Sequence, residues 1–121
     1  MGCTSSDDRK GAVKEPPTLA DGTQRSSDQI GKQYKSFKVV TSRKGHQTTI
    51  ATDEFNNQTV ILERYGYDQK DRALAEWQVA LFNVLKAKST DCIPNTLAVN
   101  ITTPKDKKED IFVYVSMQYL D

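Results

Sequence analysis

Apolar side chains recur every three or four positions between residues 72 and 88, whereas the segments on either side alternate between apolar and polar residues. This spacing predicts a helix from Arg72 to Lys88. Its apolar stripe, which Val79 and Phe82 widen, consists of Leu74, Trp77, Leu81, Val84 and Leu85. We expect the stripe to pack on a sheet, with Trp77 in the core. A period that changes from two to 3.6 and back restricts the fold to a combination of sheet and helix.

Five segments rich in β-branched and aromatic residues predict strands. They run from Tyr34 to Thr41, Gln47 to Phe55, Gln58 to Tyr67, Leu97 to Thr103 and Ile111 to Tyr119. Gly45 and the pair Asn56-Asn57 predict tight turns, because Gly and Asn tolerate positive φ. The order β-β-β-α-β-β predicts an α+β fold, in which one antiparallel sheet of about five strands carries one helix on one face.

Residues 7–30 contain only three large apolar side chains, namely Val13, Leu19 and Ile30. Such a segment buries too little surface to offset the entropy lost on ordering. We therefore predict a disordered tether over residues 1–30 and a folded domain over residues 31–121. A flexible chain of the tether's length reaches roughly 25–30 Å. The net charge of +1 provides no general attraction to nucleic acid, so no nucleic-acid partner is expected.

The first six residues, Met1-Gly2-Cys3-Thr4-Ser5-Ser6, match the N-myristoylation pattern M-G-x-x-x-[ST]. Removal of Met1 would expose Gly2 as the myristoyl acceptor, and Cys3 offers a thiol for S-palmitoylation. A single myristoyl chain binds membranes only weakly, with K of about 10⁴ M⁻¹. A palmitoyl chain adds about 0.8 kcal/mol for each buried CH₂ group, which makes attachment long-lived. The motif predicts a protein held at a membrane by two acyl chains.

The same residues, together with Lys10 to Glu15, resemble the N-terminus of inhibitory-class G-protein α subunits. This resemblance implies myristate on Gly2 and palmitate on Cys3. It covers about 15 of the 121 residues. No G-x-x-x-x-G-K-[ST] phosphate loop follows, and Pro16 and Pro17 interrupt the helix with which such subunits continue. The resemblance therefore implies the lipids and not a GTPase.

Dual acylation predicts a location on the cytosolic face of a membrane, either the plasma membrane or its ciliary or flagellar extension. Ser5 and Ser6 are candidate phosphorylation sites, because phosphate next to the bilayer would be repelled by anionic lipids. The alternative is that these serines only keep the segment soluble.

Two surfaces of the domain are candidates for contacts. Basic residues cluster where the tether enters the domain, at Lys32, Lys35, Lys38, Arg43 and Lys44. They predict either contacts with anionic lipid headgroups or an edge strand protected against aggregation. Phe112 and Tyr114 alternate with the inward side chains of the last strand, so either the tether covers them or they form a patch that binds a partner.

No set of residues indicates a chemical site. His46, the single histidine, is expected to be exposed in a turn, and Cys92 is expected to be a small, buried or half-buried side chain. No catalytic residues, metal ligands or cofactor motifs are predicted. The sequence favours a non-enzymatic interaction or adaptor module that binds an unknown protein partner at the membrane. The alternatives are a module that binds anionic headgroups through Lys32 to Lys44, and a small membrane-bound enzyme.

Overall fold

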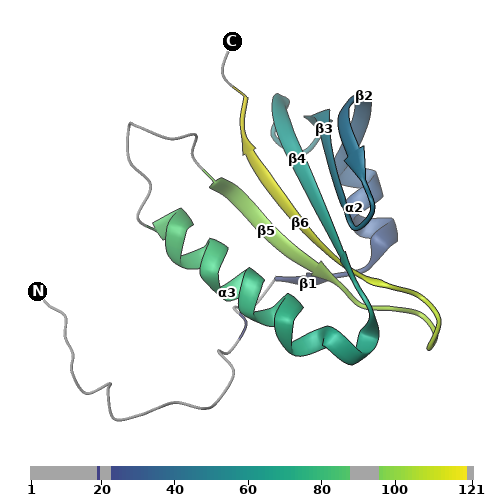
Figure 1. The fold of residues 1–121 in the computed structure, drawn as a ribbon. Coiled ribbons are helices and arrows are strands. Elements are labelled where there is room, and N and C mark those ends of the chain that lie inside the picture. The colour runs from purple at the N-terminus through teal and green to yellow at the C-terminus, as the bar shows by residue number, and fades with distance from the viewer. Residues whose placement is uncertain (1–18, 20–22, 88–95, 120–121) are drawn as a thin grey trace, which may run out of the picture.

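The computed structural model describes residue 19, residues 23–87 and residues 96–119. Figure 1 shows a twisted sheet with the long helix α3 across one of its faces. The elements in chain order are β1 (Gln24–Arg25), α2 (Ser27–Gln33), β2 (Tyr34–Arg43), β3 (His46–Asp53), β4 (Gln58–Tyr67), the 3₁₀ turn η1 (Gln69–Asp71), α3 (Arg72–Ala87), β5 (Thr96–Thr102) and β6 (Ile111–Gln118). The α+β class is confirmed, and the five predicted strands are all present.

The sheet differs from the prediction in size and in pairing. It has six strands in the order β1-β5-β6-β4-β3-β2, and β1 runs parallel to β5 with Gln24 opposite Ile101. The expectation of about five antiparallel strands was therefore wrong, and the sheet is mixed. Strand β1 has only two residues, neither of them apolar, so it produces no alternating pattern.

The second difference is helix α2, which lies partly within residues 23–30, assigned above to the tether. Ser26 caps this helix: its hydroxyl accepts from the Gln29 N–H, and the Gln29 side chain accepts from the Ser26 N–H. This reciprocal pair is a capping box, visible in the sequence as S-x-x-Q. Ile30 is buried. The folded part of the chain consequently reaches back at least to Thr23, whose carbonyl accepts from Ile101 N–H.

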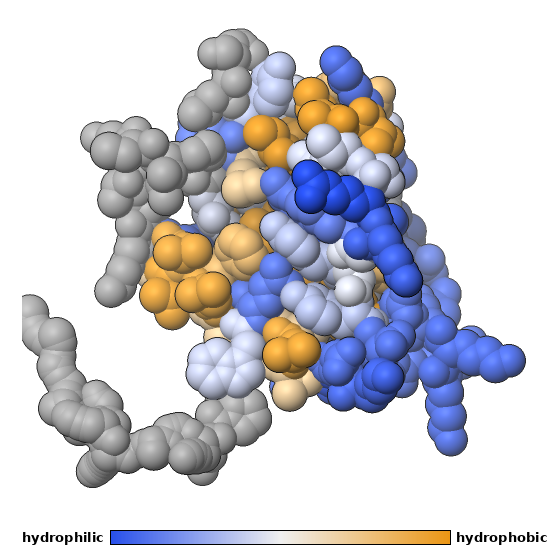
Figure 2. All heavy atoms as spheres, in the orientation of Figure 1, coloured by the Kyte–Doolittle hydropathy of each residue, from blue (hydrophilic) through white to orange (hydrophobic). Residues whose placement is uncertain are grey.

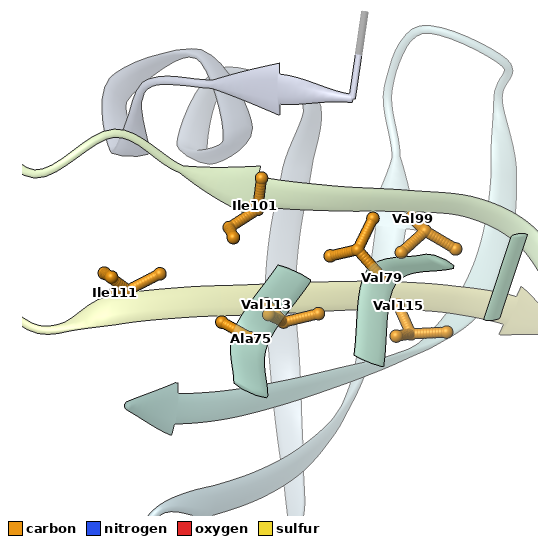
Figure 3. Close-up of a cluster of buried hydrophobic side chains, with 7 residues drawn as sticks. All are labelled: Ala75, Val79, Val99, Ile101, Ile111, Val113 and Val115. Atoms are coloured by element: carbon orange, nitrogen blue, oxygen red, sulfur yellow. The ribbon is translucent and has the colours of Figure 1, made fainter. Parts of the chain in front are cut away.

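Two apolar clusters stabilise the two faces of the sheet. Figure 3 shows the first, in which Ala75 and Val79 of α3 face Val99 and Ile101 of β5 and the β6 residues Ile111, Val113 and Val115. The second cluster consists of Ile30, Tyr34, Ala51, Val60 and Leu62. Because neighbouring side chains in a strand point to opposite faces, the two clusters are separated by the sheet. Helix α2 thus covers part of the face that α3 leaves open.

A buried carboxylate organises the turn between β3 and β4. One oxygen of Asp53 accepts from Gln33 Nε2 at 3.0 Å, from Phe55 N–H at 3.0 Å and from Asn56 N–H at 3.2 Å. Its other oxygen accepts from Asn56 Nδ2 at 2.8 Å. The Gln33 side chain also accepts from Arg25 at 2.6 Å. Asp53 therefore links the end of α2 to the turn.

The predicted turn at Asn56-Asn57 is confirmed, and Asn57 has φ of 53°. We expect Asn57→Val to lower the free energy of unfolding by about 1–2 kcal/mol, since a β-branched side chain clashes with the backbone in the left-handed region. Asn57→Gly should stay within about 0.5 kcal/mol of the parent, because Gly adopts this conformation without strain. Urea denaturation of the three proteins measures both effects. Equal destabilisation by Val and Gly would contradict this explanation.

Candidate functional site

The side of α3 that packs on the sheet includes Val79 and Phe82, which were predicted to widen the apolar stripe, but not the five residues of the stripe itself. Ala75 and Val79 are fully buried and Phe82 packs beside them. These side chains follow one another at intervals of four and three, so they form a narrow stripe. Ala75 is small enough to let the helix lie close to the isoleucines and valines of β5 and β6. The bulkier predicted stripe is turned away from the sheet, and the expected core position of Trp77 was wrong.

The outward stripe forms a surface that we name the α3 apolar face. Its side chains are between 42% and 60% exposed, and they are Leu74, Trp77, Leu81, Val84 and Leu85. Figure 2 shows hydrophobic side chains gathered over α3. Single exposed apolar residues are common on protein surfaces, but a continuous stripe of five large ones is typical of surfaces that bind other molecules.

A groove of about 750 Å³ opens where the α3 apolar face meets the end of β4. It is lined by Trp77, Leu81, Phe82 and Val84 of α3 and by Tyr67 of β4. The Tyr67 hydroxyl donates to Gln78 Oε1, so these two polar groups satisfy each other. Burial raises the pKa of Tyr67 above its ordinary value, which keeps its hydroxyl neutral. Among the described residues, the groove is therefore lined without any charged side chain.

The charges on α3 itself are few. Arg72 Nε donates to Glu76 Oε2 at 2.8 Å, one turn along the helix. Lys86, in the last turn, is the third charged residue. Every other side chain of α3 is uncharged, so the α3 apolar face itself carries no charged residue.

Beside the groove, the same face of the sheet is polar. His46 Nε2 lies 2.5 Å from Glu63 Oε1, which also accepts from Thr48 Oγ1 at 3.0 Å. The imidazole stacks on Tyr65 with ring centroids 4.5 Å apart, and Tyr65 in turn stacks on Phe82. The expected exposed turn position of His46 was wrong: the residue begins β3 and is half-buried. Its partners Glu63 and Tyr65 lie on β4. The sequence around His46 does not indicate this contact, because β4 is far from it in sequence.

The predicted basic residues lie on α2, on β2 and in the turn after it. Strand β2 is at the edge of the sheet, and all five of Lys32, Lys35, Lys38, Arg43 and Lys44 are exposed. Two irregularities in the register of β2 interrupt its pairing with β3. These positions fit both an edge protected by lysines and contacts with anionic headgroups, so both interpretations stay open.

A second hollow, of about 500 Å³, lies at the end of the sheet where β2 turns into β3. Basic side chains line it, from Arg43, Lys44 and Arg64, together with acidic ones from Asp68, Asp71 and Asp110. Because both signs of charge are present in similar number, the hollow offers no net attraction to an anion or a cation.

Phe112 and Tyr114 are half-buried rather than fully exposed. Arg64 lies over the Phe112 ring, with its guanidinium carbon 5.0 Å from the centroid. Tyr114 packs against the cluster around Ile30, which belongs to α2. Residues of α2 and β4 thus provide part of their cover. Neither side chain contributes to the α3 apolar face.

Gly2, Cys3, Ser5 and Ser6 lie outside the described residues, as does Cys92. Over the part of the chain that is described, no helix combines the length and apolar character needed to cross a bilayer. Within the same part, no three His, Cys, Asp or Glu side chains are grouped as metal ligands.

Neither protein-family models nor curated proteins give a match to this sequence. The function is therefore inferred from the exposed side chains of the α3 apolar face and from the acylation pattern at the N-terminus.

Proposed function

We propose that this protein is a dually acylated peripheral membrane protein whose domain is a non-enzymatic interaction module on the cytosolic face of a membrane. Myristate on Gly2 and palmitate on Cys3 would provide the attachment, and a protein partner would bind the domain. The membrane proposed is the plasma membrane or its ciliary or flagellar extension. The observation that carries the proposal is the α3 apolar face, since α3 already buries a full stripe against the sheet and still exposes five large apolar side chains.

The groove favours binding over catalysis. Its lining offers hydrocarbon and aromatic surface, and its Tyr67 and Gln78 side chains are bonded to each other. General acid–base or nucleophilic catalysis needs titratable groups directed at a substrate, and the part of the lining that the structure describes has no carboxylate, imidazole or amine.

The attachment is tested first by the intact mass of the native protein, which should carry a myristoyl group and a palmitoyl group. In cell fractionation, we expect the parent protein in the membrane fraction and Gly2→Ala in the soluble fraction. Cys3→Ser should divide between the two, because one chain gives only reversible binding. A native N-terminus without fatty acid would refute the acylation, whatever the domain binds.

The partner is tested by proximity labelling from the acylated protein in cells. Neighbours that depend on the interaction surface should be lost in Leu85→Asp and retained in Val39→Asp, which places the same charge at an exposed site on β2. Identical neighbours in both variants would show that the α3 apolar face does not bind the partner.

Headgroup binding is the second candidate function, and the exposure of all five basic residues along α2 and the β2 edge favours it. A Gly2→Ala, Cys3→Ser protein should then sediment with anionic vesicles in a salt-sensitive manner. If it stays in the supernatant at low salt, the basic residues serve to protect the edge.

A further inference from the structure

The groove beside α3 has the chemistry of a hydrocarbon site. Its volume of about 750 Å³ falls within the usual range of small-molecule pockets, and its walls are Trp77, Leu81, Val84 and Phe82. A lipid headgroup, a nucleotide or a charged peptide would find no charged group to pair with among the described residues that line it. An unsubstituted acyl chain requires none, because its binding depends on apolar area alone.

The chain itself carries such a ligand if Gly2 is acylated. Leu19 packs against the cluster that contains Ala75 and Val79, so the N-terminal segment joins the domain on the side of the sheet where α3 lies. Gly2 precedes Leu19 by 17 positions. A segment of that length spans at most about 60 Å, which exceeds the length of α3 itself at about 1.5 Å per residue. The acyl group can therefore reach the groove of its own molecule.

We infer that the groove formed by Trp77, Leu81, Val84, Phe82 and Tyr67 binds the myristoyl chain of Gly2 when the protein is away from the membrane. This inference depends on the acylation proposed above. An intramolecular ligand acts at an effective concentration on the order of millimolar, so the groove is occupied if it binds the chain with a dissociation constant below that concentration. Insertion of the chain into a bilayer empties the groove and frees the α3 apolar face. The face is then available to a partner only at the membrane.

The acyl chain on Cys3 shifts the equilibrium between myristate in the groove and myristate in the bilayer. With myristate alone, the groove and the bilayer compete for one weakly bound chain. A second chain on Cys3 favours the bilayer, because each of its CH₂ groups adds to the membrane affinity when it is buried there. Groove binding is thus a property of the once-acylated form.

The single tryptophan of the protein, Trp77, reports occupancy directly. The full chain with Cys3→Ser is myristoylated at Gly2, and intact mass verifies the attachment. Its Trp77 emission should shift to shorter wavelength and be quenched severalfold less by acrylamide than in the unacylated Gly2→Ala, Cys3→Ser protein. Leu81→Asp, at a 56% exposed position, should abolish this protection, whereas Val39→Asp, at a 54% exposed position, should not. Circular dichroism verifies that both variants fold.

Binding of the same once-acylated proteins to vesicles gives a second measurement. It separates groove binding from direct contact of the α3 apolar face with lipid, because the two predict opposite changes in the vesicle-bound fraction. Blocking the groove with Leu81→Asp should raise the vesicle-bound fraction severalfold, since the released chain is free to insert. A lower bound fraction would mean that the α3 apolar face itself contacts lipid, and would overturn the inference.

The remaining outcomes are also decisive. Attached myristate with Trp77 as accessible as in the unacylated protein overturns groove binding and leaves the proposed acylation intact. Failure of the acyltransferase to modify Gly2 refutes the acylation, and myristic acid added to the Gly2→Ala, Cys3→Ser protein then tests the groove alone. Protection of Trp77 that rises with protein concentration in the unacylated form would assign the face to a second copy, and would also overturn the inference.

Discussion

Replacement of Val79 with aspartate is expected to unfold the domain, with a loss of at least about 3–5 kcal/mol in the free energy of unfolding. Val79 lies on α3 and is fully buried against the valines and isoleucines of β5 and β6 (Figure 3). A carboxylate at this position would have no hydrogen-bond partner or counter-charge among these side chains. Domains of this size have stabilities of only about 5–15 kcal/mol, so little folded protein would remain. Far-ultraviolet circular dichroism and urea denaturation measure the loss.

The matched control is Val84→Asp, which makes the same change on the same helix. Val84 is 52% exposed on the α3 apolar face, so its carboxylate stays in water. We expect a change within about 0.5 kcal/mol, as for other surface substitutions. If Val84→Asp unfolds the protein and Val79→Asp does not, then α3 packs on the sheet with the stripe that contains Val84, and the site proposed here does not exist.

The second large effect is expected at Asp53. Its alanine variant should be about 2–4 kcal/mol less stable, because the donors from Gln33, Phe55 and Asn56 lose their shared acceptor. Asp53→Asn should lose less, since an amide oxygen can still accept some of these bonds. Urea denaturation at neutral pH ranks the three proteins. Equal stability of all three would contradict the role of the carboxylate in the turn.

Acid provides an independent measurement at the same residue. Burial alone raises the pKa of Asp53, but hydrogen bonds from Asn56, Gln33 and Phe55 outweigh it and hold the pKa below its ordinary value. The ionised carboxylate is thus favoured in the folded state. Its contribution is present above the unfolded pKa of about 3.9 and is lost as the pH falls through the lower folded pKa. The stability advantage over Asp53→Asn should therefore shrink below about pH 4, as acid titration of both proteins would show.

The strands and α3 could be predicted because their signals are local and repeated. The alternation in Ile111–Gln118 and the turn at Asn56-Asn57 depend on neighbours in sequence, and the structure has both. Strand β1 could not be found in this way, since it pairs with β5 over a separation of 77 positions. The capping box of α2 is present in the sequence as Ser26 and Gln29. Disorder was nevertheless predicted for residues 1–30, because they contain so few apolar side chains.

The face of α3 was misjudged for a physical reason. Periodicity shows that Leu74, Trp77 and Leu81 share one side of the helix, but it does not show what lies against that side. α3 has two apolar stripes, and the smaller side chains of Ala75 and Val79 fit closer to the sheet. The candidate site thus consists of the side chains that the pattern assigned to the core. Its partners at Tyr67 and Tyr65 come from β4, which only the folded chain brings near.

The parallel pairing of β1 with β5 also sets an order of events during synthesis. Gln24 cannot find its partner Ile101 until a ribosome has added 77 more residues. At about 5–20 residues per second, this delay lasts roughly 4–15 s. For that interval Gln24 and Arg25 are not yet paired with β5, so an acyltransferase acting on Gly2, as proposed above, would meet a nascent peptide rather than a folded protein.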